Sequence, residues 1–292
     1  MELVVERPGP LTTVQDQGRR GVAHLGVPRA GALDGPALAA ANRLVGNPPG
    51  AAALETTLGG VALRASAPLL VAVTGAPAPV RVGGRPAAWG AAVAVGAGEL
   101  VEIGAATHGV RSYLAVAGGI AVPEVFGSRS ADLLSGLGPS PLRTGDRLPV
   151  GPPPPAPGGE LVPLPGPPAE LFLPLRPGPR ADWFTPAAFT ALARGRYRIS
   201  PASNRIALRT EGPALPRART GELPSEGMVL GAVQVPPDGH PVIFLADHPT
   251  TGGYPVIGVV PAAALPLAAQ ARPGTPLRFT LLGRTDVQRR AR

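Results

Sequence analysis

The chain has 292 residues, a mass of 29.4 kDa and a formal net charge of +8, and it contains no cysteine. That length allows one large domain or two ordinary ones, each with its own core. The lack of cysteine excludes disulfides, thiolate nucleophiles, zinc fingers and iron–sulfur clusters. All 27 basic residues are arginine, which also excludes a Schiff-base lysine, a P-loop lysine and a biotinylated lysine on this chain.

Composition favours a folded, mainly β protein. Glycine and proline contribute 40 residues each, yet 44% of the chain is hydrophobic and only 16% is charged. Short apolar runs between Gly/Pro breaks are typical of strands joined by tight turns, not of a solvated coil. The arginines are scattered and aromatic residues make up 4% of the chain, so the positive charge does not indicate nucleic-acid binding.

The N-terminus lacks the basic region and apolar stretch of a signal peptide, and no later apolar run approaches the length of about 18 residues that a membrane helix needs. We therefore expect a cytoplasmic protein.

The N-terminal half is predicted to be rich in strands, with one clear helix. Residues 2–6 form the first predicted strand. A helix is expected from Asp34, which can cap it, to Gly46, which can end it, because Leu38 and its apolar neighbours recur at helical spacing. Residues 54–117 alternate short apolar runs with Gly and Pro turns, which predicts antiparallel strands.

The stretch PVGPPPPAPGG, residues 149–159, is predicted to be an extended surface connection, because proline supplies no donor to a strand ladder. It separates an N-terminal β-rich subdomain with one helix, residues 1–150, from a C-terminal β subdomain, residues 160–292. In the second subdomain we expect helices at residues 182–194 and 262–271 and strands at residues 196–200, 205–210, 229–235, 241–246, 256–260 and 277–282.

The segment LADHPTTGGYPVIG, residues 245–258, is the first candidate site. The predicted strand 241–246 delivers Asp247 at its end, where a carboxylate can meet a substrate. The following turn carries two hydroxyls, two glycines that permit positive φ and close approach to a ligand, and a phenol, at Thr250, Thr251, Gly252, Gly253 and Tyr254. An ordinary turn in which Asp247 satisfies backbone amides is the alternative. Composition alone leaves the two open.

Two further polar clusters stand out. In SPASNRIALRTEG, Asn204 and Arg205 precede an alternating strand, and an arginine there can clamp a carboxylate bidentately or simply project from a turn. In TTVQDQGRRG, an ion pair from Asp16 to Arg19 or Arg20 that holds the loop is the favoured interpretation.

Metal and nucleotide sites receive no support from motifs. The four histidines lack HxxxH or HExxH spacing, and neither GxGxxG nor a Walker loop occurs. The sequence therefore predicts no metal site and no nucleotide-binding device on this chain.

Seven motifs taken in order resemble the biotin-dependent carboxyltransferase C/D family, also called the allophanate hydrolase subunit 2 or KipA family, and within it the type of the 5-oxoprolinase C subunit. They are TTVQDQGRRG, GALDGPALAAANRLVGN, ALETTLGG, RSYLAVAGG, SNR, GMVLGAVQVPPDGHP and DHPTTGGYP. The resemblance runs from about residue 11 to residue 282. It implies a mainly β (α+β) fold of cyclophilin-like β-barrel units with a few short helices in two subdomains.

The resemblance also implies function. The main expectation is the C subunit of a bacterial 5-oxoprolinase, which hydrolyses 5-oxo-L-proline to L-glutamate with ATP in a complex with the A and KipI-like B subunits, and which is inactive alone. This chain would then bind no cofactor by itself, and the complex would use ATP. One alternative is a KipA-type regulator that antagonises a KipI-like inhibitor of a histidine kinase. Another is the carboxyltransferase half of a urea carboxylase-type enzyme.

Family motif positions give the expected site residues. The expected catalytic residues are Asp247, Arg205 and Tyr254. The expected substrate-binding residues are Asn204, Gln234, Thr250, Thr251, Gly252, Gly253 and Glu226, and a possible second cluster comprises Gln15, Asp16 and Asp34. In this hypothesis Asp247 orients or deprotonates an amide N–H, Arg205 holds a carboxylate and the Thr-Thr-Gly-Gly turn contacts the carbonyl under attack.

Overall fold

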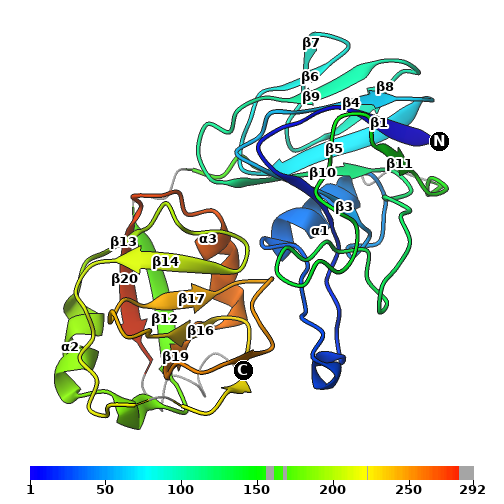
Figure 1. Ribbon diagram of the computed structural model, residues 1–292. Coiled ribbons are helices and arrows are strands. Elements are labelled where there is room, and N and C mark those ends of the chain that lie inside the picture. Colours follow the sequence, from blue (N-terminus) through cyan, green and yellow to red (C-terminus); the bar gives the residue numbers. More distant parts are fainter. Residues whose placement is uncertain (156–160, 167–169, 222, 283–292) are drawn as a thin grey trace. The chain divides into compact units, whose positions relative to one another are not determined.

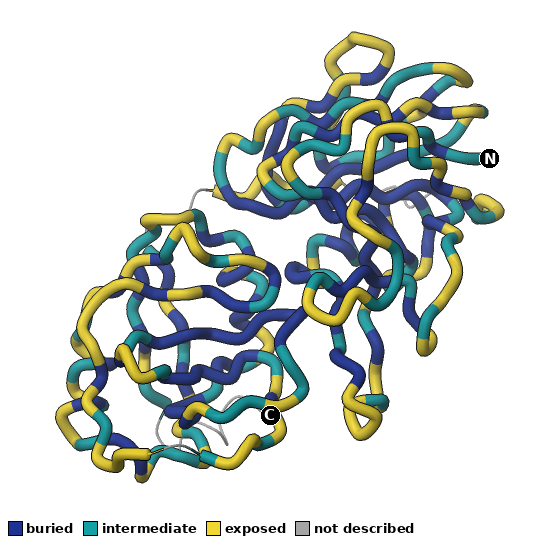
Figure 2. Tube along the Cα trace, viewed as in Figure 1, coloured by how far each residue is buried: buried dark blue, intermediate teal, exposed yellow. Residues whose placement is uncertain are grey.

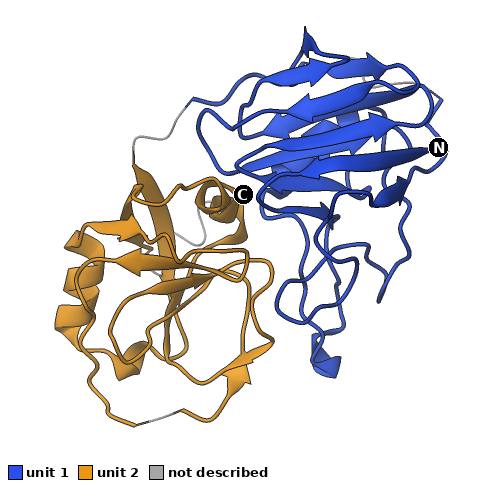
Figure 3. Cartoon of the chain, turned by 45° about the horizontal axis from the view of Figure 1, so that its top comes forward, with its two compact units in different colours: residues 1–167 blue, residues 168–292 orange. Residues whose placement is uncertain are grey.

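The computed structural model describes residues 1–155, 161–166, 170–221 and 223–282. The chain divides into two compact units, Met1–Pro167 and Pro168–Arg292 (Figure 3). No helix in the described ranges is long and apolar enough to cross a membrane.

Unit 1 contains two antiparallel sheets (Figure 1). The six-stranded sheet has the order β11-β1-β4-β9-β6-β7, and the five-stranded sheet has the order β2-β3-β10-β5-β8. Their strands are β1 (Glu2–Pro8), β2 (Thr12–Gln15), β3 (Ala53–Thr57), β4 (Val61–Ala65), β5 (Leu69–Gly75), β6 (Val80–Val82), β7 (Arg85–Ala87), β8 (Ala92–Val95), β9 (Leu100–Ile103), β10 (Arg111–Val116) and β11 (Arg147–Pro149).

The main core of unit 1 lies between these two sheets. One buried cluster takes Leu3 and Leu63 from the six-stranded sheet and Leu54, Val73 and Leu114 from the five-stranded sheet. Figure 2 shows buried positions along the central strands and exposed ones at many of the turns. The sheets therefore pack face to face as a sandwich, with inward-facing apolar residues from both.

Helix α1 (Gly35–Leu44) covers the other face of the five-stranded sheet. Its residues Leu38, Ala41 and Leu44 share a second buried cluster with Ala72 of β5 and Tyr113 of β10. All six residues of β10 are consequently buried, as expected for a strand that is covered on both faces.

The predicted start and end of α1 are both confirmed. Asp34 Oδ1 accepts a hydrogen bond from the Ala37 N–H at 3.1 Å, which satisfies one of the donors that every helix start leaves unpaired. At the other end Gly46 adopts φ 78°, a left-handed conformation that glycine reaches without steric cost.

Unit 2 is a closed seven-stranded barrel in the order β12-β19-β16-β17-β14-β13-β20. Its strands are β12 (Leu171–Pro177), β13 (Tyr197–Ile199), β14 (Ala207–Glu211), β16 (Ala232–Gln234), β17 (Val242–Phe244), β19 (Val256–Val259) and β20 (Pro276–Leu281). The first and last of these close the barrel, because β12 and β20 pair in parallel from Leu171↔Leu277 to Leu175↔Leu281. Closure leaves the barrel without an unpaired edge.

Short elements complete unit 2. The strands β15 (Glu226–Gly227) and β18 (Thr251–Gly252) form a separate two-stranded ribbon. Helix α2 (Pro186–Arg194) is capped by Thr185, whose Oγ1 accepts from the Ala188 N–H at 3.2 Å. The remaining helical turns are η2 (Ala181–Trp183), η3 (Ala262–Ala264) and α3 (Leu265–Ala269).

The predicted fold class is confirmed. The chain is mainly β with a few short helices and contains a closed barrel. Sequence patterning misses the strands β2 and β12. Strand β2 reads TTVQ and is polar but fully buried, whereas β12 carries prolines at both Pro174 and Pro177, so neither matches an apolar alternating pattern.

Unit 1 extends beyond the predicted connection at residues 149–159, of which residues 156–160 lie outside the described residues. Residues 161–166 are tied to unit 1, because the Val162 N–H donates to Gly90 O at 2.9 Å and His108 Nε2 hydrogen-bonds Pro165 O at 2.8 Å. Val162 also packs against the cluster under α1. The observed division therefore falls between Pro167 and Pro168.

Candidate functional site

The end of β17 brings Asp247 beside Arg205. The chain continues from β17 through Leu245, whose N–H donates to Ile206 O at 2.9 Å, and the Asp247 N–H donates to Arg205 O at 3.1 Å. Two main-chain bonds thus align the residues after β17 with those before β14. They position two side chains that are 42 residues apart in sequence.

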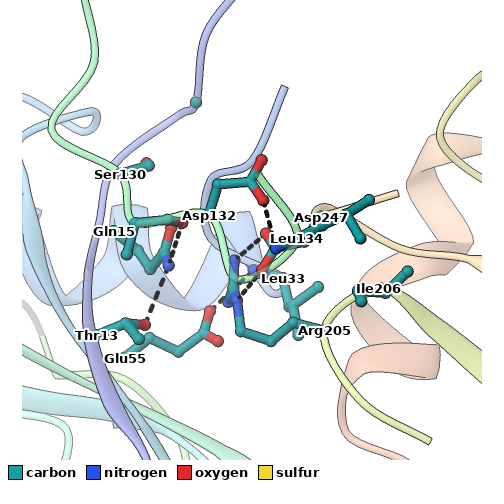
Figure 4. A network of polar contacts seen from close by, with 12 residues as sticks. Thr13, Gln15, Leu33, Glu55, Ser130, Asp132, Leu134, Arg205, Ile206 and Asp247 are labelled. Atoms are coloured by element: carbon teal, nitrogen blue, oxygen red, sulfur yellow. Dashed lines mark hydrogen bonds and ion pairs between the residues drawn. The ribbon is translucent and has the colours of Figure 1, made fainter. Parts of the chain in front are cut away.

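Arg205 and Asp247 form a bidentate ion pair (Figure 4). Arg205 Nε lies 2.9 Å from Asp247 Oδ2, and Arg205 Nη2 lies 2.9 Å from Asp247 Oδ1. Both side chains have 0% exposure. Two parallel N–H···O bonds fix the plane and direction of the carboxylate, which a single contact would not do.

This pairing changes the expected role of Arg205. The sequence hypothesis assigned Arg205 to a substrate carboxylate, but two of its nitrogens already hold Asp247. The geometry instead supports a role in which Arg205 orients Asp247.

The turn after Asp247 is held by the β15–β18 ribbon. Glu226 pairs with Gly252, and Gly227 pairs with Thr251. The Met228 N–H donates to Thr250 O at 2.9 Å. The turn that the sequence singled out is therefore fixed to a second segment by main-chain bonds.

Gln234 ties this turn to β16. Its Nε2 donates to Tyr254 O at 3.0 Å and contacts Met228 Sδ at 3.3 Å. Tyr254 thus contributes its carbonyl to the network, while the residue as a whole is 46% exposed. Gln234 is buried, as a positioned amide should be.

The two glycines of the turn act differently from expectation. Neither Gly252 nor Gly253 has the positive φ that the sequence hypothesis proposed. Position 252 requires a glycine because there is no room for a side chain: an added Cβ would lie 2.7 Å from Gln234 Nε2 and 3.3 Å from Met228 Cγ. The turn therefore provides close packing and not an anion-binding nest.

Two other expected substrate-binding residues have local partners. Asn204 Oδ1 accepts from the Ile206 N–H at 2.8 Å and the Ala207 N–H at 3.3 Å, so this side chain starts β14. Glu226 forms an ion pair with Arg180, whose Nε lies 3.1 Å from Glu226 Oε2. Thr250 is partly buried and Thr251 is exposed.

In unit 1, Asp16 organises the segment from Ser128 to Asp132. Its Oδ1 accepts from the Ser128 hydroxyl at 2.6 Å and the Ser130 hydroxyl at 2.6 Å, and its Oδ2 accepts from the Arg129 N–H at 2.6 Å. The expected ion pair from Asp16 to Arg19 or Arg20 was wrong, because hydroxyl and backbone donors already occupy this carboxylate. Arg19 donates to carbonyl oxygens instead, reaching Ser130 O at 2.6 Å.

Gln15 and Asp132 each present a buried acceptor. Gln15 Nε2 donates to Thr13 Oγ1 at 3.0 Å and to Ala131 O at 3.1 Å (Figure 4). Asp132 Oδ1 accepts from the Leu134 N–H at 2.8 Å. Within the described ranges Gln15 Oε1 and Asp132 Oδ2 are buried and have no hydrogen-bond partner. Such acceptors suit the N–H donors of an amide substrate.

Asp34 belongs to a chain of buried hydrogen bonds below α1. The Asp34 N–H donates to the Tyr113 hydroxyl at 2.8 Å, and this hydroxyl donates to Glu55 Oε2 at 2.7 Å. Burial raises the pKa of Tyr113 well above its usual 10, and the Glu55 and Asp34 carboxylates raise it further. The phenol therefore stays neutral, and Asp34 serves the helix start.

The sequence hypothesis missed Ser128, Ser130 and Asp132. All three are buried and alternate with other residues in SRSAD. That period of two was the available signal, because it places all three on one face of an extended segment. Among the described residues no group of three or more His, Asp or Glu is placed to hold a metal ion.

Comparison with known proteins identifies the family. The model of the carboxyltransferase domain, subdomain A and B, matches residues 25–281. This chain belongs to that family. The match names subdomains A and B where the sequence resemblance named C and D. It includes the whole Asp247 segment, whereas Gln15 and Asp16 precede it.

Individual relatives agree with this assignment. The C subunit of 5-oxoprolinase from Escherichia coli K12 is 39% identical over 98% of this chain and 96% of its own. The crystallised protein TTHA0988 is 39% identical with a TM-score of 0.87, covering 96% of this chain and 56% of that one. This chain therefore spans little more than half the length of TTHA0988. The Kluyveromyces lactis urea carboxylase is 30% identical with a TM-score of 0.87, covering 97% of this chain and 27% of that one.

Proposed function

We propose that this chain is the C subunit of a 5-oxoprolinase, a hydrolase that opens the lactam ring of 5-oxo-L-proline to give L-glutamate. The observation that carries the proposal is the likeness to the Escherichia coli C subunit, which covers 98% of this chain and 96% of that one. Because both chains are covered almost entirely, the likeness extends to both units and is not confined to one shared module.

The reaction breaks the lactam C–N bond and adds water across it, so the ring nitrogen gains a proton and the carbonyl carbon gains an oxygen. In this proposal Asp247, held by Arg205, accepts a hydrogen bond or a proton at the reacting amide. Gln234 and Gly252 fix the position of the turn that carries Tyr254.

The active enzyme in this proposal is a complex. The names of the Escherichia coli and Haemophilus influenzae relatives describe each of them as one subunit of 5-oxoprolinase, which supports an assembly of several chains. We assign the partners as the A and KipI-like B subunits, with ATP consumed by the complex and no activity in this chain alone. The absence of a nucleotide-binding motif in this sequence supports the assignment of ATP binding to another subunit.

The test is to co-purify this chain with the A and B subunits and to measure glutamate released from 5-oxoproline and ATP. We expect release from the wild-type complex. The conservative Asp247→Asn variant should lower kcat by about 100-fold to 10,000-fold, as loss of an acid–base group does. An Arg278→Ala variant, which removes a partly exposed ion pair with Glu170, serves as the control and should retain activity. A wild-type complex that releases no glutamate overturns the proposal.

A second function is favoured by one observation, the TM-score of 0.87 with Kluyveromyces lactis urea carboxylase over 97% of this chain. In that function the same carboxylate would position urea for carboxyl transfer from carboxybiotin. The assay supplies urea and free carboxybiotin and follows the loss of carboxybiotin. Loss of carboxybiotin in the presence of urea, together with no release of glutamate from 5-oxoproline, would support the second function and exclude the first.

A further inference from the structure

The loop between β2 and α1 holds two arginines close together. Its two limbs run side by side, because the Arg19 N–H donates to Arg29 O at 2.7 Å and the Ala32 N–H donates to Asp16 O at 2.9 Å. At Gly18, which has φ 78°, an added Cβ would lie 2.6 Å from Arg29 O. The backbones therefore approach as closely as a glycine allows, and the loop is fixed at its base.

Arg20 and Arg29 line one hollow of about 180 Å³ in unit 1. A second hollow of about 420 Å³ adjoins it and shares Asp16, Gln17 and Arg20 as lining residues. A water molecule takes up about 30 Å³ in the liquid. The smaller hollow therefore has room for a phosphate-sized or carboxylate-sized group together with some of its water.

The one acidic residue that lines these hollows is not the counter-ion of the arginines. Asp16 Oδ1 already accepts from two hydroxyls and from the Gly18 N–H at 2.8 Å, and its Oδ2 accepts from a backbone N–H. Across the described residues, no carboxylate forms an ion pair with Arg20 or Arg29. The start of α1 adds little positive charge, because Asp34 caps it.

Two guanidinium groups that line one hollow and have no carboxylate in an ion pair with either of them destabilise each other. Burial lowers the pKa of the Arg29 guanidinium, and the positive charge of Arg20 lowers it further. An anion between them would relieve this repulsion. Guanidinium groups are also the side chains that bind planar carboxylates and phosphates through two parallel N–H···O bonds.

We propose that this hollow is an oxyanion-binding site, in which Arg20 and Arg29 hold the phosphate or carboxylate group of a ligand. Neither arginine is among the residues assigned to the hydrolysis reaction. The proposal does not depend on the proposed function, since binding is measured on this chain alone.

Isothermal titration of the full-length chain at low ionic strength tests the proposal, with inorganic phosphate and L-glutamate as separate probes. We expect saturable binding of one anion per chain for at least one probe. Saturation by phosphate alone identifies a phosphoryl ligand, and saturation by glutamate alone identifies a carboxylate ligand.

Matched variants test whether the anion binds in this hollow. Arg20→Gln and Arg29→Gln should each raise the Kd at least tenfold, because each removes one of the two guanidinium groups that bind the anion. Arg143→Gln, which changes an exposed arginine elsewhere in unit 1, should leave the Kd unchanged. Circular dichroism verifies that every variant is folded. The absence of saturable binding by either probe, or equal binding by the Arg20→Gln/Arg29→Gln double variant, overturns the proposal.

Discussion

At the scale of single residues, the fully buried Arg205–Asp247 pair is a position where loss of one side chain should lower stability strongly. Replacing Asp247 by Ala leaves the guanidinium of a fully buried arginine without its bidentate partner. We expect the free energy of unfolding to fall by about 3–5 kcal/mol, the usual cost of breaking a buried ion pair on one side. Urea denaturation followed by circular dichroism measures this change as a lower midpoint.

Two controls separate the ion pair from general effects of substitution. Arg278→Ala removes a partly exposed ion pair and should cost no more than about 1 kcal/mol. The paired substitution Arg205→Met with Asp247→Leu removes both charges and should recover part of the stability that Asp247→Ala loses. A loss below about 1 kcal/mol for Asp247→Ala would contradict the ion-pair account.

Tyr197 offers a stabilising substitution in the barrel. Its hydroxyl is buried and has no partner in the part of the chain that the structure describes, while its ring packs edge-to-face on Phe279 with centroids 5.6 Å apart. Tyr197→Phe keeps the ring contact and removes the unsatisfied group. We expect a gain of about 1 kcal/mol in the free energy of unfolding at neutral pH.

The same substitution should alter the alkaline dependence of stability. Burial raises the pKa of Tyr197 to about 12, above the value of about 10 in an unfolded chain. The titration of Tyr197 therefore leaves stability unchanged below about pH 10, and stability falls as the pH rises from about 10 towards 12, because the phenol deprotonates more readily in the unfolded chain than in the folded one. The advantage of Tyr197→Phe should grow across that window in thermal melts. Tyr254→Phe, at an exposed position, should change stability by less than about 0.5 kcal/mol.

At the scale of elements, the β15–β18 ribbon provides a matched pair of glycines. In Gly252→Ala the new methyl would lie 2.7 Å from Gln234 Nε2 and must displace that amide from Tyr254 O. In Gly227→Ala, on the paired strand, the methyl meets nothing within 4 Å. We expect a loss of about 1–3 kcal/mol for the first substitution and almost none for the second.

Activity of the assembled complex gives a second readout of the ribbon. Gly252→Ala should lower glutamate release together with stability, whereas Gly227→Ala should leave both unchanged. Equal activity of the two variants would show that the Gln234 contact is not needed for the reaction.

Elements with a local signature could be predicted from the sequence, and elements without one could not. Helix α1 followed from an Asp cap, an apolar face and a terminal glycine, all within 13 residues of one another. Strand β2 could not be predicted, because its buried threonines and glutamine are stabilised by hydrogen bonds to residues far along the chain, such as Thr56 and Ala131.

The candidate site shows the same limit. The Asp247 segment was identified from its motif, but the sequence assigned Arg205 to a ligand, since nothing local indicates that β14 and β17 pair. Asp132 was missed although its alternating spacing was visible, because only the fold places SRSAD against β2. Pairings between distant segments determine these contacts, and such pairings cannot be predicted from a single sequence.

At the scale of the whole molecule, the barrel of unit 2 joins the two ends of its own sequence. Strand β12 begins the described part of the unit and β20 ends it, and the two pair in parallel over five residues on each strand. This pairing is the contact that converts an open sheet into a closed barrel. The stability of the unit should therefore depend on β20 more than on any internal turn.

Two fragments test this dependence. A fragment of residues 168–292 contains all seven barrel strands and should fold alone, with a β-type circular dichroism spectrum and a cooperative thermal transition. A fragment of residues 168–274 lacks β20, so β12 and β13 each lose a neighbouring strand, and we expect it to show no cooperative transition. If the shorter fragment melts as cooperatively as the longer one, closure by β20 does not stabilise the barrel. If neither melts cooperatively, unit 2 requires the rest of the chain to fold.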